Sequence, residues 1–353
     1  MRILHLAAGN RWTGAAAPAF AEVAALREAG VDAHYAYVGG YKLEQKLAHV
    51  GFAHPAIAKA QNPVSFLRTA NALEHLIDHH RFDVVHAHLT YDHVLARFIA
   101  GREKVRIVRT FHSRRVIRGD PFTAALIRRT DALCVINDAL AEAPAIRGRS
   151  ALYTPPPLDS AQFTPVGPDL REAYHIENDA LCLAAIGKLD PSRGFEDVLR
   201  TYALVRHKIA GARLMIIGHG PHRPALEELA RSLAVEPIWA GYHEDDLGQH
   251  YRAADVLLFT ARGSDEGHRA VIEAMGCGIV PATYRLEGMP TILGELGAEC
   301  ISSSPTPEAL SERVVAIAQG DLAASRRAAF ARSAEFSYGR AAERLIGLYE
   351  SIL

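Results

Sequence analysis

Residues Leu181–Pro221 read LCLAAIGKLDPSRGFEDVLRTYALVRHKIAGARLMIIGHGP, and this stretch decides the fold class. The short apolar run Leu181–Ile186 is followed by a turn rich in Gly and Pro. Phe195–His207 then shows apolar residues at helical spacing, and a second apolar run, Arg213–Ile217, follows. A strand, a helix and a strand in this order predict a βαβ unit with two parallel strands.

The same alternation extends over the rest of the chain. Helical patterns fill most of the gaps between short apolar runs, as in Pro18–Ala29, Arg223–Ser232 and Thr306–Ala318. We therefore predict a doubly wound α/β fold, with parallel sheets covered by helices on both faces. The ten predicted strands are Arg2–Ala7, Ala33–Val38, Val84–His88, Val105–Phe111, Ala132–Ile136, Leu181–Ile186, Arg213–Ile217, Pro237–Ala240, Val256–Thr260 and Ile279–Ala282.

One proline-rich segment interrupts this rhythm. Thr154–Gly167 reads TPPPLDSAQFTPVG, and its prolines remove backbone donors and forbid a helix. A chain of 353 residues is long enough for two domains at about 150 residues each. We interpret the segment as the linker between Rossmann-like domains at residues 1–160 and 168–335, which would face each other across a cleft. An amphipathic helix is predicted to close the chain at residues 338–353.

The composition is that of a globular protein. Hydrophobic residues make up 49% and charged residues 22%, which excludes disordered and collagen-like chains. No run of 18 apolar residues occurs, so no membrane-spanning helix is expected, and the first ten residues suit a buried strand better than a secretory signal. The four cysteines lie far apart without a CxxC motif, which predicts reduced thiols in a cytoplasmic protein.

Charge is unevenly distributed, although the formal net charge is −1. Residues 1–165 carry a net charge of +6 and residues 166–353 a net charge of −7. Much of the positive excess lies between Arg102 and Arg129, and it includes Arg114 and Arg115. A solvated surface fits this pattern, and so does an anionic partner such as a phosphorylated acceptor or the inner face of an acidic membrane. Nucleic acid is not expected, because no aromatic residues are interleaved with the basic ones.

Open α/β sheets bind ligands at the carboxyl ends of their strands, so the residues after each strand are candidates. In the second half, Gly187, Lys188 and Arg193 lie on the turn before a helix, whose N-terminus favours anions. Gly218, in the sequence Gly-His-Gly-Pro, permits a tight turn after the next strand. A solvated turn without a ligand fits the first pattern equally well, and an ordinary strand–helix turn is the favoured interpretation of the second pattern alone.

The segment after the predicted strand Val256–Thr260 carries further candidates. Asp265, Glu266, Gly267 and His268 lead into a helix with Glu273. Glu273 lies within the apolar run AVIEAMG, where an unpaired buried carboxylate would be costly. The side chain either faces solvent or binds a specific partner, and its two oxygens match the vicinal diol of a ribose.

In the first half, Trp12 and Gly14 lie between the first strand and a helix, where small residues would admit a phosphate or a sugar; a plain tight turn is the alternative. His112 follows the strand Val105–Phe111 and would lie at the edge of a cleft. His86 and His88 share one strand face, but no carboxylate or cysteine cluster accompanies them in the sequence, so no metal site is expected.

Together these segments resemble the retaining GT-B glycosyltransferases of family 4, also called group 1. The likeness is strongest over Leu181–Pro290, through IGKLDPSRGFEDVLRTYALV, RLMIIGHGP and AGYHEDDLGQHYRAADVLLFTARGSDEGHRAVIEAMGCGIVP. In the first half it rests on the Gly14 loop, on FDVVHAHL at Phe82–Leu89 and on TFH at Thr110–His112. The closing helix resembles the family's last helix, which crosses back to the first domain.

The resemblance implies roles for individual residues. Lys188 and Arg193 would hold the donor diphosphate, with the two residue types exchanged relative to the family. Glu273 would bind the ribose, and Asp265, or Glu266 one place out of register, would contact the donor sugar. His112 would lie beside the transferred sugar and Gly14 near the diphosphate. The family's Asn-Gly-Val-Asp linker motif is replaced by Pro156-Pro157-Leu158-Asp159.

The resemblance also implies an activity: transfer of a sugar from a UDP- or GDP-linked donor to the hydroxyl of a glycan or lipid-linked glycan, with retention. Trp12, Arg114 and Arg115 are the acceptor-side candidates. We expect no cofactor and no metal ion, because fixed cations would stabilise the leaving diphosphate and no DxD-type site occurs. A nucleotide-sugar 2-epimerase and a non-catalytic sugar-nucleotide-binding subunit remain alternatives. A Rossmann oxidoreductase is disfavoured because no GxGxxG follows the first strand.

Overall fold

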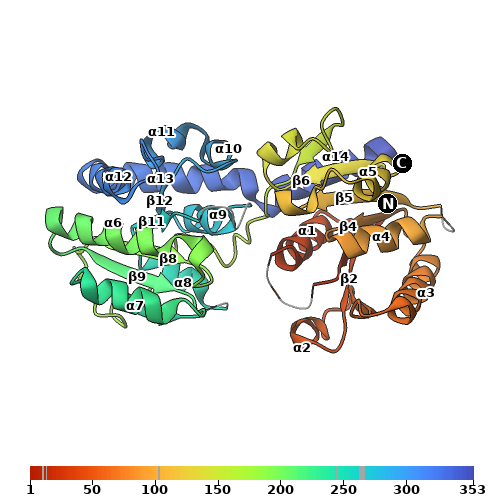
Figure 1. The fold of residues 1–353 in the computed structure, drawn as a ribbon, viewed down its shortest axis with the longest axis horizontal. Helices are drawn as coiled ribbons and strands as arrows, with labels where there is room; N and C mark the ends of the chain where they lie inside the picture. Colours follow the sequence, from red (N-terminus) through yellow and green to blue (C-terminus); the bar gives the residue numbers. More distant parts are fainter. Residues whose placement is uncertain (10–11, 13, 102–103, 244, 262–266) are drawn as a thin grey trace. The chain divides into compact units, whose positions relative to one another are not determined.

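The computed structural model describes residues 1–9, 12, 14–101, 104–243, 245–261 and 267–353. The chain divides into two compact units. Figure 1 labels helices and strands of both. The first unit consists of Met1–Pro157 together with Phe336–Leu353, and the second of Leu158–Glu335. The division falls within the proline-rich segment, where the lack of backbone donors prevents a regular element. None of the described helices is long and apolar enough to cross a membrane.

The first unit contains a parallel sheet of seven strands in the order β3-β2-β1-β4-β5-β6-β7. The two edge strands, β3 and β7, are not among the predicted ones. β3 contains a proline and β7 has only three residues, so neither gives a clear apolar run. The strands are β1 Arg2–Ala7, β2 Asp32–Val38, β3 Ala53–Ile57, β4 Val84–Ala87, β5 Arg106–Phe111, β6 Ala132–Val135 and β7 Ala151–Tyr153.

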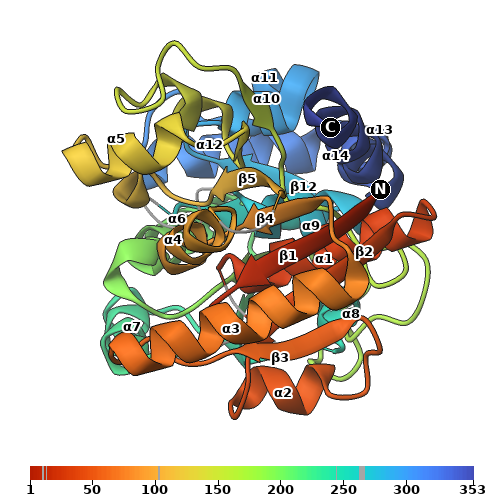
Figure 2. The same ribbon diagram turned by 90° about the vertical axis from the view of Figure 1, so that its right-hand side faces the viewer.

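Helices cover both faces of this sheet (Figure 2). One core contains Leu26 of α1 and Leu345 and Tyr349 of α14. The other contains Leu73 of α3 and Leu95 of α4. The prediction that the closing helix returns to the first domain is confirmed, because α14 packs against α1 and buries Tyr349 completely. The helices are α1 Ala16–Glu28, α2 Lys42–Leu47, α3 Pro63–His80, α4 Thr90–Ile99, α5 Pro121–Arg128 and α14 Tyr338–Ile352.

The second unit contains a parallel sheet of five strands in the order β10-β9-β8-β11-β12. All five were predicted, with ends that differ by a residue or two at most. The strands are β8 Cys182–Ile186, β9 Arg213–Ile217, β10 Ile238–Gly241, β11 Val256–Phe259 and β12 Val280–Thr283. The helices are α6 Phe195–Lys208, α7 Arg223–Ser232, α8 Leu247–Arg252, α9 Arg269–Gly276, α10 Met289–Leu293, α11 Gly297–Cys300, α12 Pro307–Gln319 and α13 Leu322–Ser333.

Glycines allow the loops after β8 and β9 to pack backbone against backbone. Gly187 N donates to Ile217 O at 3.0 Å, and Leu189 N donates to His219 O at 3.0 Å. Gly218 has φ +143°, and a Cβ atom there would lie 1.9 Å from Gly187 O. Only glycine fits this position, because a side chain would both clash and strain the backbone.

We therefore predict that Gly218→Ala destabilises the protein by about 3 kcal/mol, through backbone strain and overpacking at one position. Thermal unfolding would measure this as a lower Tm. Gly211→Ala is the matched control in the same unit, because a Cβ atom at position 211 would have no described atom within 4 Å. Equal Tm values for the two variants would contradict the close packing of the loops.

Candidate functional site

The loop between β8 and α6 carries two of the predicted donor-binding cations. Asp190 shapes the loop, because its Oδ1 accepts hydrogen bonds from Ser192 N at 3.2 Å and from Ser192 Oγ at 2.9 Å. Lys188 Nζ donates to Asp190 Oδ2 at 3.2 Å, and the lysine side chain is 61% exposed. These contacts lower the pKa of Asp190, with the hydrogen bonds from Ser192 as the largest cause. The loop thus fixes Lys188 and Arg193 within six residues at the carboxyl end of β8.

The N-terminus of α6 follows directly from this loop. Gly194 has φ +71°, and Thr260 Oγ1 donates to Gly194 O at 2.8 Å. A Cβ atom at position 194 would lie 2.7 Å from Thr260 O, so this turn also requires glycine. Among the described residues, no side chain caps this helix end. A helix N-terminus without a side-chain cap and two nearby cations are features that suit an anion such as a diphosphate.

The segment between β11 and α9 is only partly described. Asp265 and Glu266, the two candidates for the donor sugar, lie outside the described residues. Gly267 is buried beside His268, which occupies the N-cap position of α9 with φ +49°. His268 Nε2 donates to Glu287 O at 2.7 Å, which ties the start of α9 to the loop before α10. Such a positive φ is uncommon for a residue with a side chain.

Glu273 is buried on α9 and has protein partners on both oxygens. Arg269 Nε donates to Oε1 at 2.6 Å, one helical turn away, and Tyr251 Oη donates to Oε2 at 3.2 Å. The sequence analysis did not point to Tyr251, which lies on α8. These two donors resolve the choice that the sequence left open, because the carboxylate binds specific partners instead of facing solvent.

The first-unit candidates lie around the start of α1 and the end of β5. Gly14 has φ +60° and precedes α1. Trp12 packs its ring against Phe20 at 5.2 Å between centroids, with Lys46 Nζ 4.7 Å above the ring. Arg114 and Arg115 are exposed on a short turn after β5, and Arg114 Nη2 donates to Ala139 O at 3.0 Å. Trp12 therefore has a packing role in the first unit, and its acceptor role stays a prediction.

His112 directly follows β5 and lies within hydrogen-bond distance of another histidine. Its Nε2 lies 3.0 Å from Nδ1 of His88. Burial lowers the pKa of His112 to about 3, and the positive charge of Arg109 adds to this effect. Arg109 is itself buried, and its guanidinium donates to Ala87 O at 3.2 Å and to Thr110 O at 2.7 Å. His112 is therefore a neutral imidazole at physiological pH.

The structure places a carboxylate beside the histidines, which the sequence had not indicated. Glu22 Oε2 lies 3.6 Å from His5 Nδ1 and 3.7 Å from His88 Nε2. The reason is topological: β1 pairs with β4 so that His5 is opposite His86, and α1 covers the same face. Among the described residues, His5, Glu22, His86 and His88 form a group that could hold a metal ion. The sequence reasoning that no carboxylate accompanies His86 and His88 is therefore wrong.

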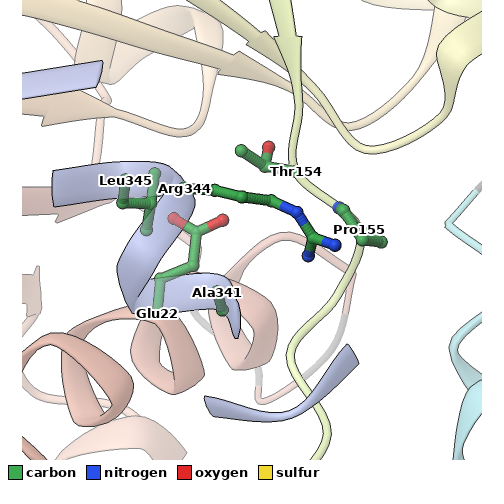
Figure 3. A pocket seen from close by; sticks show the side chains of 6 residues that line it. All are labelled: Glu22, Thr154, Pro155, Ala341, Arg344 and Leu345. Carbon is green, nitrogen blue, oxygen red and sulfur yellow. The ribbon is translucent and has the colours of Figure 1, made fainter. Parts of the chain in front are cut away.

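Glu22 is almost completely buried, and burial raises its pKa to about 8. Its carboxyl group also lines a small pocket between α1, α14 and the chain after β7 (Figure 3). Arg344 of α14 lines the same pocket. A signal for this arrangement was present in the sequence, since Glu22 interrupts the apolar face of Pro18–Ala29, but its partners lie on distant strands.

The two halves of the chain match two related families. Residues 12–143 match the family described as Glycosyltransferase Family 4, and residues 180–319 match Glycosyl transferases group 1. The second match includes Lys188, Arg193 and Glu273, and the first includes Gly14 and His112.

Two relatives illustrate the sequence similarity. The GDP-mannose-dependent alpha-(1-6)-phosphatidylinositol monomannoside mannosyltransferase of Mycobacterium tuberculosis is 28% identical over 151 residues, which cover 41% of this chain and 38% of that protein. The match thus spans about two fifths of the length of that relative. A D-inositol 3-phosphate glycosyltransferase of Actinosynnema mirum is 27% identical over 306 residues, which cover 76% of this chain and 72% of the relative.

Solved structures share the fold over nearly the whole chain. Anabaena HepE in complex with UDP superimposes with a TM-score of 0.82 at 15% identity, covering 99% of this chain and 100% of that one. Sucrose-phosphate synthase from Thermosynechococcus elongatus gives a TM-score of 0.79 at 16% identity, covering 99% and 98%. The two parallel sheets are of the Rossmann-like type. The two family matches and the solved structures indicate the same fold. The chain therefore belongs to the group 1 glycosyltransferases, with a family 4 domain in its first half and the GT-B fold.

Proposed function

We propose that this protein transfers a sugar from a nucleoside diphosphate sugar to a hydroxyl group of a glycan or lipid-linked glycan, with retention at the anomeric carbon. The observation that carries the proposal is the loop before α6, where Lys188 and Arg193 precede a helix N-terminus that has no side-chain cap among the described residues, at the carboxyl end of β8. In a chain of this family, that loop offers the positive groups that a diphosphate needs.

The donor would be held mainly by the second unit. Gly187 and Gly218 keep side chains away from the backbone at the carboxyl ends of β8 and β9. Glu273 would accept hydrogen bonds from the ribose, because each carboxylate oxygen can accept a further bond beside the one from its protein partner. Backbone groups of Gly267 and the His268 side chain would border the sugar. Gly14 of the first unit would approach the diphosphate.

The chemistry would proceed by stabilising the departing nucleoside diphosphate. Negative charge develops on the β-phosphate as the bond to the anomeric carbon breaks, and Lys188, Arg193 and the α6 N–H groups would stabilise it. The acceptor hydroxyl would attack from the face that the phosphate leaves, and its proton would pass to a phosphate oxygen. This route retains the configuration and needs no metal ion at the diphosphate.

His112 would act on the transferred sugar as a neutral hydrogen-bonding group. Because its pKa is lowered to about 3, it does not carry a positive charge at neutral pH. A neutral ring can orient a sugar hydroxyl without repelling the positive charge that develops on the sugar. The residue would thus position the sugar and exclude water from its reactive face.

The acceptor is proposed to be a lipid-linked or phosphorylated glycan. Arg114 and Arg115 are exposed on the first unit, and the net charge of residues 1–165 is +6. The mycobacterial relative is named for a phosphatidylinositol mannoside acceptor, and the Actinosynnema relative for an inositol phosphate. Both acceptors carry phosphate, which suits a basic surface at the inner face of a membrane.

The decisive experiment is a thermal-shift screen with UDP- and GDP-linked sugars, because a true donor raises the Tm by mass action. The stabilising donor is then incubated with and without acceptors, and the products are identified by NMR. An acceptor-linked sugar of unchanged anomeric configuration supports the proposal. A 2-epimerised nucleotide sugar would contradict the proposal and identify an epimerase. Binding without turnover would contradict it and identify a non-catalytic binding subunit.

Lys188→Ala is expected to lower kcat by on the order of 10²-fold, because one charge-stabilising donor is lost in the transition state. Steady-state kinetics measure the effect. Lys208→Ala is the control, since Lys208 is an exposed lysine at the other end of α6. Unchanged turnover in Lys188→Ala would remove this residue from the mechanism.

Glu273→Ala is expected to weaken nucleotide binding by on the order of 10-fold, because a charged hydrogen-bond acceptor for the ribose is lost. Calorimetry with UDP and GDP gives the Kd. Glu227→Ala removes a similar carboxylate, whose pair with Arg223 lies on the surface of α7, and should leave the Kd unchanged. If Glu273→Ala does not fold, nucleotide binding is measured with Glu273→Gln instead. Wild-type affinity in both Glu273 variants would refute the ribose role.

Added Mg²⁺ is expected to leave kcat unchanged from zero to millimolar concentration, because the diphosphate charge is met by Lys188 and Arg193. The rate is measured in buffer without divalent ions and after titration with MgCl₂. A rate that depends on Mg²⁺ would contradict the metal-free account of the donor site.

A further inference from the structure

Four side chains with metal-ligating atoms meet in the core of the first unit. His5 lies on β1, His86 on β4, His88 directly after β4, and Glu22 on α1. All four are buried, and their ligand atoms lie within 4.8 Å of one another. Strand pairing brings them together, because His5 is opposite His86 in the sheet and α1 covers the same face. The cluster therefore gathers three imidazoles and one carboxylate in one place.

Glu22 lacks a hydrogen-bond partner in this cluster. Its Oε2 is shielded from solvent and has no partner among the described residues. His5 Nδ1 lies 3.6 Å away and His88 Nε2 lies 3.7 Å away, and both distances exceed the usual length of an N–H···O hydrogen bond. An unsatisfied buried carboxylate oxygen is costly, so native proteins rarely leave one without a partner. A cation between the three atoms would supply this partner.

The distances between these three atoms fit a bound ion. His5 Nδ1 and His88 Nε2 are 2.9 Å apart and form a triangle with Glu22 Oε2. The point equidistant from the three corners lies about 2.0 Å from each, and Zn²⁺ binds imidazole nitrogen and carboxylate oxygen at about 2.0–2.2 Å. An ion therefore fits the triangle with little movement of the side chains, and it would replace the hydrogen bond between the two histidines.

The outer nitrogens of the two histidines have partners of the kind found around metal sites. His5 Nε2 lies 3.1 Å from the hydroxyl of Tyr349, and His88 Nδ1 lies 3.0 Å from His112 Nε2. Metal-ligating histidines commonly use their second nitrogen in such a hydrogen bond, which holds the ring in place. The orientation of both rings is thus supported from outside the triangle.

The donor atoms select the class of ion. Imidazole nitrogens with one carboxylate suit Zn²⁺ and its neighbouring transition metals, whereas Mg²⁺ and Ca²⁺ prefer oxygen ligands. His86 offers a fourth ligand atom, and structural zinc sites have four ligands. The nitrogens of His86 lie 2.7 Å from Tyr349 Oη and 2.6 Å from Thr110 Oγ1. Ligation by His86 would exchange one of these hydrogen bonds for a bond to the ion.

We propose that the first unit holds one Zn²⁺ ion, bound by His5 Nδ1, His88 Nε2 and Glu22 Oε2. One nitrogen of His86 is the fourth ligand. The ion joins β1, β4 and α1 and touches no substrate, because its ligands are buried. It is incorporated as the unit folds, since the ligands come together only then. The proposal is independent of the sugar-transfer function, which needs no metal ion at the diphosphate.

Zinc content is the first test. The full chain is expressed with a purification tag that contains no histidine, in medium supplemented with ZnCl₂. Mass spectrometry then quantifies the metal that remains after gel filtration. About one equivalent of zinc is expected for a closed site with four ligands. Less than about a tenth of an equivalent would overturn the proposal.

Glu22→Gln and His5→Phe test the ligands. The first keeps the size of the side chain and removes its charge, and the second keeps a ring and removes its nitrogens. Each variant, once circular dichroism shows it to be folded, should retain less than about a tenth of the zinc. His93→Phe is the matched control, because His93 is a buried histidine of the same unit whose Nε2 bonds to Thr130 Oγ1 instead. Wild-type zinc in either folded ligand variant, or equal loss in folded His93→Phe, would overturn the proposal.

A second group of histidines is a competing location in the same unit. His34 of β2, His54 of β3 and His80 of α3 also place ligand atoms within 4.8 Å of one another. His54→Asn should leave the zinc content unchanged. Loss of zinc in His54→Asn, with zinc retained in Glu22→Gln, would assign the ion to this second group and overturn the proposal.

X-ray absorption at the zinc edge identifies the donor atoms. Nitrogen and oxygen neighbours at about 2.0–2.1 Å are expected, with the outer scattering of imidazole rings. Sulfur at about 2.3 Å would place a cysteine on the ion and overturn the ligand set.

Stability gives an independent readout, because an ion that binds only the folded state raises the Tm. Zinc-loaded protein should unfold about 5 °C or more above the same protein expressed in zinc-depleted medium. Glu22→Gln should show one Tm from both media. Equal Tm values for the two wild-type preparations would overturn the proposal. None of these measurements depends on turnover, so a zinc-bound protein that transfers no sugar would refute the proposed function and leave the metal site in place.

Discussion

Parallel pairing of adjacent strands is the constraint on which both units depend. It brings the carboxyl ends of β1, β4 and β5 to one edge in the first unit, and those of β8, β9 and β11 to one edge in the second. Loops that are far apart in the sequence become neighbours there, such as Gly187 and Gly218. Parallel strands also need crossover helices, and the N-termini of those helices point to the same edge. The pairing therefore places the N-terminus of α6, with Lys188 and Arg193 before it, at this edge as a consequence of the fold.

Three buried carboxylates of this protein differ in the partners that surround them. Asp255 accepts from Arg171 at 2.6 Å and from Arg326 at 2.9 Å, which makes it a structural ion pair within the second unit. Glu273 is paired with Arg269 and Tyr251. Glu22 Oε2 has no hydrogen-bond partner among the described residues, and burial raises the pKa of this side chain to about 8. Burial without a hydrogen-bond donor favours the neutral form of a carboxyl group.

Much of the fold could be predicted from the sequence, because short apolar runs alternate with stretches of helical periodicity. The missed strands β3 and β7 lie at the sheet edges, where pairing on one side only tolerates short and polar sequences. Lys188 and Arg193 could be named as candidates from the sequence, because the pattern that points to them lies within eight consecutive residues. Tyr251 could not be named from the sequence, because its contact with Glu273 joins residues that are 22 positions apart on different helices.

The sequence by itself determined the alternation of elements, the linker position and the residues that follow each strand. These features depend on local backbone preferences and on the periodic placement of apolar side chains. The tertiary structure alone decided that His5, His88 and His112 share hydrogen bonds and that Tyr349, more than 200 residues away, ends beside them. The physical reason is that strand order and helix docking are set by the packing of whole faces, and a hydrogen bond between distant residues exists only after that packing has brought them together.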